Sequence, residues 1–354
     1  MTKEIYRALQ ERLDMYSLGF PATASGVEMK ILQKLFHPAD VEMFMALTPK
    51  LESAERISRR IEKPKEDVTV QLEDMTERGL LFRNKKGGEV RYGAIPFVHG
   101  LFEFQVNNLD RELAGLVEQY HLEAFHKTFE NSGGMFLRTV PVRESIDTAR
   151  HVAAYDDAVR LLKEKETIVV ADCICRKQKN TIDEGCGKML EACFMFGSMG
   201  EYYIDKGMGR RIDVDEAINI LKQAQTEGLV TQPATTQNPA GMCNCCGDCC
   251  GVLRALRQSP KPAELVFSNY FAEVEKDLCT GCEVCMDRCQ MDAIVMDDDL
   301  AEINRDRCIG CGLCITTCPT EAVHLVPKPA KAHMTPPLNT AEQMMTMAQK
   351  RGLC

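Results

Sequence analysis

Apolar residues recur at helical spacing through most of the first hundred residues. The recurrence predicts helices at residues 27–36, from residue 38 onward, at 52–61 and at 64–79. Pro38 and Pro64 stand in the first turn of the second and fourth of these helices, where the missing N–H of proline costs no hydrogen bond. The segment LLFRNKKGGEVRYGAIPF then alternates around a Lys-Gly-Gly turn, which predicts a two-stranded hairpin.

The middle of the chain mixes helical and strand-like patterns, so we expect an α/β domain over residues 101–265. Helices are expected near residues 108–130 and 147–165, and strands at FLRTVPV and TIVVADC. Asp213 and Glu216 form a capping-box pair before the helix AINILKQAQ, which Gly228 ends. No P-loop and no dinucleotide fingerprint is present.

The last part of the chain begins with a Pro- and Lys-rich stretch after Pro327. It leads into TAEQMMTMAQK, a short Met-rich amphipathic helix. Two interpretations remain open: a strap over the protein's own surface, or a helix that docks on a partner.

Composition narrows the class of protein. The 354 residues carry a net charge of −9, which argues against broad binding to nucleic acid or to anionic membranes. No apolar run approaches the roughly 20 residues of a spanning helix, and the first residues MTKEIYRALQERLD are amphipathic and not signal-like. We therefore expect a cytoplasmic protein without membrane insertion.

The 18 cysteines are the most informative feature. They are absent from the first 172 residues and then gather in four groups. Crowded thiols in a reducing compartment indicate metal binding, because disulfide scaffolds are short and secreted.

Two of these groups form an internal repeat. CTGCEVCMDRC starts at Cys279 and CIGCGLCITTCP starts at Cys308, and both follow C-x2-C-x2-C-x3-C. The repeat resembles the two-cluster bacterial ferredoxins, in which the fourth Cys of each run ligates the other [4Fe–4S] cluster. The resemblance implies one cluster on Cys279, Cys282, Cys285 and Cys318, and the other on Cys308, Cys311, Cys314 and Cys289.

The repeat departs from the ferredoxin pattern at one position. Gln290 follows Cys289 where many relatives have Pro, a residue that shapes the turn and is not a ligand. Paired zinc knuckles are the alternative interpretation, but zinc ribbons do not duplicate this four-Cys run.

The middle domain carries nine further cysteines, enough for one or two additional [4Fe–4S] clusters. They are Cys173, Cys175, Cys186, Cys193, Cys243, Cys245, Cys246, Cys249 and Cys250. Strand alternation is expected to point Cys173 and Cys175 to one side, and Cys186 and Cys193 could share one helical face. We therefore assign one cluster to these four and a second to the residues 243–250. Zinc and a reactive dithiol pair remain the alternatives, while Cys354 and the seven His are interpreted as having no ligand role.

The tandem Cys-Cys-Gly in this region is similar to motifs of heterodisulfide-reductase-like proteins, but its short repeat does not fit their spacing. The whole layout resembles 4Fe–4S binding proteins of anaerobic bacteria. That resemblance implies a multidomain α+β fold with a winged-helix-like domain at residues 1–100, the cysteine-rich domain at 101–265, a two-cluster ferredoxin-like domain at 266–330 and a tail at 331–354.

Three functions are compatible with the predicted domains and cysteine ligands. The first is an electron-transfer subunit or adaptor that docks on a redox protein partner, and residues 276–326 suit such docking with 4 basic and 10 acidic side chains. The second is an oxidoreductase with a substrate site at the central cysteines. The third is a redox-sensing winged-helix regulator. Against the third, the would-be recognition helix at residues 64–79 is acidic, so no nucleic-acid binding is expected. A homo-oligomer or a larger complex fits the first two functions.

Overall fold

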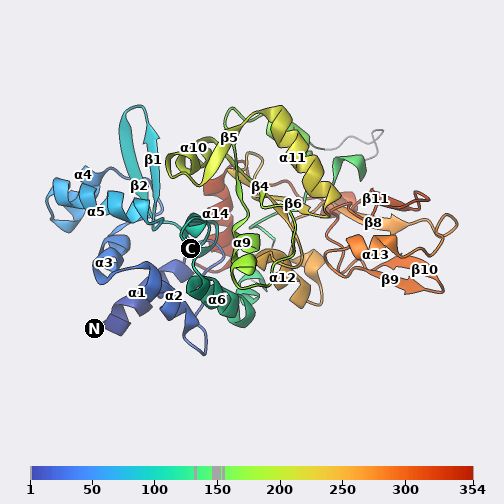
Figure 1. Cartoon of the computed structure of the whole chain (residues 1–354), viewed down its shortest axis with the longest axis horizontal. Coiled ribbons are helices and arrows are strands. Elements are labelled where there is room, and N and C mark those ends of the chain that lie inside the picture. The colour runs from blue at the N-terminus through green and yellow to red at the C-terminus, as the bar shows by residue number, and fades with distance from the viewer. Residues whose placement is uncertain (1, 131–133, 146–152, 154–155, 354) are drawn as a thin grey trace.

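The structure, a computed structural model, describes residues 2–130, 134–145, 153 and 156–353. Three parts follow one another along the long axis of the molecule: N-terminal helices with a hairpin, a central five-stranded sheet, and a C-terminal part with two small sheets (Figure 1). Buried apolar side chains from Tyr6 to Met347 form one hydrophobic cluster, so the N-terminal helices share a core with the rest.

The N-terminal part consists of five helices and one hairpin. They are α1 (Thr2–Asp14), α2 (Val27–Leu35), α3 (Pro38–Ala46), α4 (Ala54–Ile61), α5 (Lys65–Glu77), β1 (Phe82–Lys86) and β2 (Glu89–Gly93). Each predicted helix and the hairpin are present within a few residues of the expected bounds. α5 buries Val68, Leu72 and Met75, the apolar residues at helical spacing. The assignment of these elements to a winged helix stays a prediction.

The hairpin is held against the central part. Arg83 of β1 pairs with Glu73 of α5 and with Asp205 of α10 (Gly197–Asp205). Tyr202 of α10 donates a hydrogen bond to the carbonyl of Leu81 at 3.1 Å. These contacts fix the hairpin on the sheet domain.

An interrupted helix links the hairpin to the sheet. α6 (Arg111–Tyr120) continues through a wider helical turn at His121–Phe125 into α7 (Lys127–Glu130), which confirms the helix predicted near residues 108–130. Before α6 the chain turns sharply at His99, whose φ of 58° is in the left-handed region that a non-glycine residue rarely adopts.

The central sheet has the strand order β5-β3-β4-β7-β6. Its strands are β3 (Ile168–Asp172), β4 (Glu191–Phe196), β5 (Gly209–Ile212), β6 (Val230–Pro233) and β7 (Gly241–Cys245). All pairings are antiparallel, so the α/β prediction for this domain is corrected to α+β. The physical reason is that the segment after β3, which includes α9 (Ile174–Thr181), returns to the same end of the sheet, where Asp172 pairs with Glu191.

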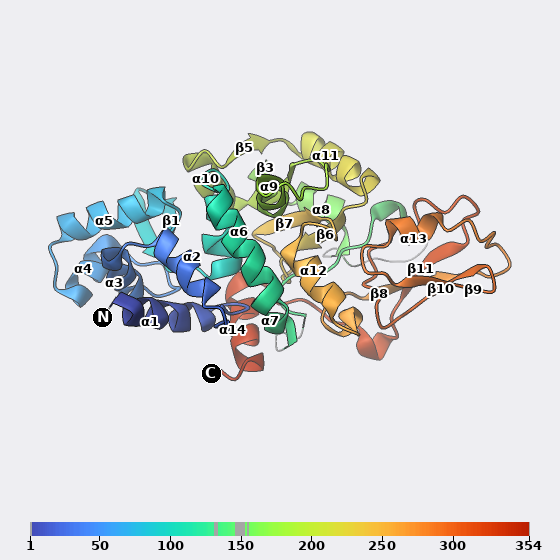
Figure 2. The ribbon, with the colours of Figure 1, turned by 60° about the horizontal axis from the view of Figure 1, so that its bottom comes forward.

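Helices cover both faces of this sheet. α8 (Ala158–Lys163) and α11 (Val214–Thr226) bury one face, and α10 packs on β3 from the other (Figures 1 and 2). α11 has the predicted cap, because the Asp213 side chain accepts from Glu216 N at 2.8 Å. α8 is the end of the helix predicted at 147–165; residues 146–152 and 154–155 lie outside the described residues.

The predicted strand FLRTVPV does not form as a regular strand. It makes isolated bridges from Leu137 to Ala234 and from Arg138 to Phe267. Its N–H groups bond alternately to β6 and to Phe267, as in Val140 N to Thr231 O and Thr139 N to Phe267 O. This segment therefore bonds to β6 and to Phe267 in turn, instead of pairing along its length with a single strand.

The C-terminal part holds two small antiparallel sheets and one short helix. They are β8 (Tyr270–Val274) with β11 (Val323–Pro327), β9 (Ile294–Asp297) with β10 (Leu300–Ile303), and α13 (Val284–Arg288). The segment AIVMDDDLAEIN forms the hairpin of β9 and β10, and Asp298 and Asp299 form its turn with positive φ. EAVHLV forms β11, which pairs with β8 and not with that hairpin.

The tail crosses back over the molecule as α14 (Thr340–Lys350), seen in red behind the sheet in Figure 1. Gln343 Nε2 donates to the carbonyls of Met135 and Phe136, and Met347 is fully buried. Arg351 donates to the carbonyls of Asp14 and Ser17 in the N-terminal part. Of the two interpretations of this helix, the structure shows the strap. Within the described ranges, no helix has both the length and the apolar character needed to cross a bilayer.

Candidate metal centres

The eight cysteines of the C-terminal repeat line two small cavities. We call their residues the first and the second four-thiol set. The first set is Cys279, Cys282, Cys285 and Cys318. The second set is Cys289, Cys308, Cys311 and Cys314. The fourth cysteine of each run thus lies with the first three of the other run.

The backbone around both sets is closely wrapped. Gly281 and Gly310 have positive φ of 66° and 68°. A Cβ at Gly281 would lie 2.2 Å from the carbonyl oxygen of Asp299, and one at Gly310 would lie 2.3 Å from that of Tyr270. Only glycine fits both positions, and this lets each loop fold around its thiols.

The thiols of the second set fit an iron–sulfur cluster chemically. Ala293 N donates to Cys289 Sγ at 3.2 Å and Ala272 N to Cys308 Sγ at 3.4 Å, as backbone amides do around cluster thiolates. Burial raises the pKa of Cys289, and it raises the pKa of Cys311 to about 12. Without a bound cation these buried thiols would stay protonated. A cation bound among them would favour the thiolate form.

The nine central cysteines lie on different elements from those expected. β3 ends at Asp172, Cys173 is the residue before α9, and Cys175 lies in its first turn, so the prediction of one strand through both is wrong. Cys193 lies in β4 and Cys186 in the loop before it, so these two do not share a helix. The remaining five are in β7, in the turn after it and directly before α12 (Gly251–Gln258).

Six of the nine form a closed ring of neighbouring thiols, here called the six-thiol ring. In order around it stand Cys173, Cys175, Cys250, Cys245, Cys243 and Cys193. Interactions between neighbouring thiols lower the pKa of one thiol and raise the pKa of the next, all the way round. Such a ring cannot ionise fully unless cations lie among the sulfurs.

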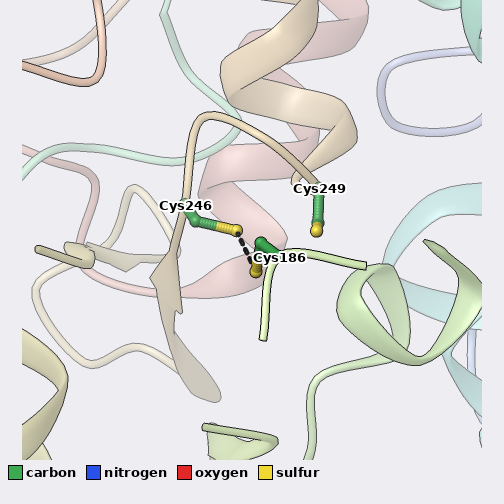
Figure 3. A group of neighbouring side chains, drawn as sticks. All are labelled: Cys186, Cys246 and Cys249. Atoms are coloured by element: carbon green, nitrogen blue, oxygen red, sulfur yellow. Dashed lines mark hydrogen bonds between the residues drawn. The ribbon is translucent and has the colours of Figure 1, made fainter. Parts of the chain in front are cut away.

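The other three central cysteines form a separate three-thiol group. The sulfur atoms of Cys186, Cys246 and Cys249 all lie within 4.8 Å of one another (Figure 3). Cys186 Sγ is 3.8 Å from Cys246 Sγ.

This division differs from the grouping that we predicted. Cys186 lies with Cys246 and Cys249, and not in the six-thiol ring with Cys173, Cys175 and Cys193. The pairing of β4 with β7 sets Cys193 directly opposite Cys243 and so joins cysteines of the two predicted groups. This contact joins residues 50 positions apart, and nothing in their local spacing reveals it.

A buried arginine lies between the two central groups. Arg176 is 1% exposed, and both Nη atoms donate to the carbonyl of Asn244 at 3.2 Å. Its Nη1 is 3.9 Å from Cys246 Sγ. No salt bridge joins Arg176 to a described carboxylate, whereas the equally buried Arg138 pairs with Asp156. Burial lowers the pKa of Arg176, but the nearby thiolates of Cys173 and Cys193 raise it further, so the counter-charge of this cation comes from sulfur.

One histidine borders the six-thiol ring, although sequence reasoning gave no histidine a ligand role. Burial lowers the pKa of His99, but its interactions with Cys243 and with Glu103 raise the pKa above the ordinary value. His99 and Glu103 line a largely apolar cavity of about 130 Å³. Burial raises the pKa of Glu103 to about 7. His99 stands alone in VHGL with no ligand-spaced partner, so no sequence signal could have found it. Cys354 lies outside the described residues.

Comparison with known proteins identifies only the C-terminal part. Residues 272–325 match the family model of a 4Fe-4S dicluster domain. Searches among curated proteins and among solved structures found no match. The chain therefore contains a ferredoxin-type 4Fe–4S domain, and this domain supports a role in iron–sulfur electron transfer.

Proposed function

We propose that the protein relays single electrons through two ferredoxin-type [4Fe–4S] clusters and a further iron–sulfur centre in the six-thiol ring, as a subunit or adaptor of a larger redox system. The observation that carries the proposal is the pair of four-thiol sets inside the segment that matches the dicluster family. Four thiolates are the usual ligands of one [4Fe–4S] cluster, which exchanges one electron at a time.

The six-thiol ring has more ligands than one such cluster uses. It therefore suits a larger cluster or two clusters that stand close together. Cys173 and Cys250 precede the N-terminal ends of α9 and α12, where the helix dipole stabilises negative sulfur. Arg176 adds a full positive charge beside the same ring.

A direct contact between the ferredoxin-type domain and the central domain supports the relay. Gln290 follows Cys289, and its Oε1 accepts a hydrogen bond from Gly247 N at 2.6 Å. Gly247 follows Cys246 in the turn of the three-thiol group. Gln290, the departure from the ferredoxin pattern, thus joins the second four-thiol set to the central cysteines. The proline of relatives could not make this bond.

Metal analysis of the full-length chain, purified without oxygen, tests the proposal. Iron and sulfide should exceed the roughly eight iron atoms of two [4Fe–4S] clusters. Cys318→Ser should damage the cluster of the first set although Cys318 stands in the second run. Cys175→Ser should lower only the iron above eight, and Cys354→Ser should change nothing. No more than eight iron atoms in the parent chain would remove the central centre from the proposal.

A second candidate function is an oxidoreductase with a substrate site at the six-thiol ring. The cavity beside His99 favours it, because Met199, Phe136 and Tyr203 give it apolar walls and Glu103 gives it a hydrogen-bonding group. Such a cavity suits a small molecule with an apolar body and one polar head. Its polar head would meet Glu103, whose raised pKa allows it to donate a proton near neutral pH.

Turnover separates the two candidates. Small ketones, aldehydes and activated alkenes would be offered to the chemically reduced protein. A compound that reoxidises the parent protein but not the cavity-filling variant Met199→Trp would favour the oxidoreductase. If no compound does so and electron exchange with ferredoxin-type partners is unchanged in Met199→Trp, electron transfer alone remains.

A further inference from the structure

Among the residues that the structure describes, the three-thiol group is the one set of three or more His, Cys, Asp or Glu whose ligand atoms all lie within 4.8 Å of one another. In a tetrahedral zinc site with Zn–S bonds of about 2.3 Å, two thiolates stand about 3.8 Å apart. Cys186 Sγ and Cys246 Sγ are 3.8 Å apart, and Cys249 Sγ completes a triangle with no side longer than 4.8 Å. Figure 3 shows the three sulfur atoms converging from the loop before β4 and from the turn after β7.

The four-thiol sets provide a comparison within the same molecule. In a [4Fe–4S] cluster each thiolate binds a different iron, so cluster thiols stand farther apart than thiols that share one ion. Among the described residues, no three of the eight ferredoxin-type thiols lie within 4.8 Å of one another. The closer spacing of the three-thiol group therefore matches a single ion and not a cubane.

The surroundings suit three thiolates around a divalent ion. Cys246 and Cys249 are buried among Ala192, Ala224 and Leu229, which exclude water from two of the ligands. Three thiolates on a divalent ion leave one negative charge. Arg176 Nη1, 3.9 Å from Cys246 Sγ, offsets that charge.

The group has no fourth protein ligand among the described His, Cys, Asp and Glu. Asp248 stands between Cys246 and Cys249 in the chain, but its carboxylate pairs with Lys188 Nζ at 3.1 Å. Cys186 is partly exposed, so solvent reaches this side of the group. Zinc sites with three protein ligands keep the fourth position for water or another exchangeable ligand.

We infer that Cys186, Cys246 and Cys249 form a mononuclear zinc site, separate from the iron–sulfur centres, with a fourth coordination position open to a small exchangeable ligand. Both zinc ions and iron–sulfur clusters bind thiolates, so the residue type does not distinguish a zinc site from a cluster. The short distances between the three sulfur atoms make this distinction. The site joins the loop before β4 to the turn that contacts Gln290. It goes beyond the electron-transfer proposal and does not depend on it.

The full-length protein, produced with both iron and zinc in the medium and purified without oxygen, tests this inference. We expect about one zinc per chain. X-ray absorption at the zinc edge should give three sulfur neighbours and one lighter oxygen or nitrogen neighbour. This measurement needs no variant, so it does not depend on whether a substituted chain folds. A chain without zinc would refute the zinc site. Zinc with four sulfur neighbours would refute its open coordination position.

Matched variants then separate the site from the clusters. Cys186→Ser changes the most exposed of the three ligands and should remove most of the zinc while the iron content stays at the parent value. Cys175→Ser, in the six-thiol ring, should lower iron and leave zinc in place. Loss of iron with retention of zinc in Cys186→Ser would assign the three-thiol group to a cluster and refute the inference. If all iron–sulfur centres proved absent but zinc remained, only the proposed function would fail.

Discussion

Replacing Arg176 by Gln should lower the reduction potential of the centre held by the six-thiol ring. The guanidinium is buried, lies among the thiolates of Cys173, Cys193 and Cys246, and has no described carboxylate to neutralise it. Reduction adds a negative charge to the centre, and the positive charge of Arg176 stabilises that added charge. Gln removes the charge while it can keep a hydrogen bond to the carbonyl of Asn244.

The size of the shift follows from the distance. The sulfur 3.9 Å from Arg176 Nη1 is that of Cys246, which belongs to the three-thiol group, so we take about twice that distance for the charge of the ring centre. At that distance, about 8 Å, two unit charges interact by about 2 kcal/mol at an effective dielectric constant of about 20. Since about 2.3 kcal/mol corresponds to 100 mV for one electron, the expected shift is roughly 90 mV to lower potential.

A redox titration followed by EPR on the anaerobic full-length protein measures this shift, and the ferredoxin-type signals serve as an internal reference that should not move. Arg176→Lys keeps the charge and should shift the potential far less. Arg254→Gln is the matched control for a nearby arginine, because Glu118 already neutralises Arg254 at 2.5 and 2.8 Å. A shift below about 30 mV in Arg176→Gln with unchanged iron content, or an equal shift in Arg254→Gln, would refute the reasoning.

Three further predictions concern other parts of the molecule. Gln290→Ala leaves the buried N–H of Gly247 without its partner, so we expect the free energy of unfolding, measured by denaturation, to fall by about 1–3 kcal/mol. We also expect slower electron exchange between the two domains, measured by stopped-flow reduction. Glu103 binds its proton more tightly in the folded state, with a pKa of about 7, so its contribution to stability is complete below about pH 4.5 and is lost as pH rises to 7. The free energy of unfolding of Glu103→Gln should therefore rise relative to that of the parent over this interval, by up to about 3 kcal/mol. Equal pH profiles of stability for the two proteins would contradict this. The full-length protein should give no salt-sensitive DNA binding in a gel-shift assay in either redox state, because α5 is acidic and Arg78, which follows α5, is already paired with Asp40 and Asp74. Sub-micromolar binding to a defined promoter would instead favour the regulator.

The sequence predicted the parts of the structure whose causes are local. The repeated C-x2-C-x2-C-x3-C runs lie within short loops, and the sets that the ferredoxin resemblance implies are the sets that share a cavity. α5 was predictable from its apolar spacing and α11 from the Asp213 cap, because both signals are encoded within a few residues.

The central cysteines were not predictable in the same way. Cys193 meets Cys243 through the pairing of β4 with β7, and Cys186 reaches Cys246 and Cys249 across about 60 residues. Hydrophobic alternation in VVADCICR also continues past Asp172, where the chain in fact turns into α9. A single sequence contains no signal for such long-range pairing, so the nine thiols could be counted but not grouped.

The position of α14 has a consequence for how the protein is assembled. Thr340, Gln343 and Met344 close the cavity beside the six-thiol ring, and α14 follows every cysteine of that ring in the chain. All six cysteines of the ring are therefore synthesised before α14, and the cavity beside the ring lacks this wall until the helix docks. Docking also bonds Arg351 to Asp14 and Ser17, so closure over the ring coincides with attachment to the N-terminal helices.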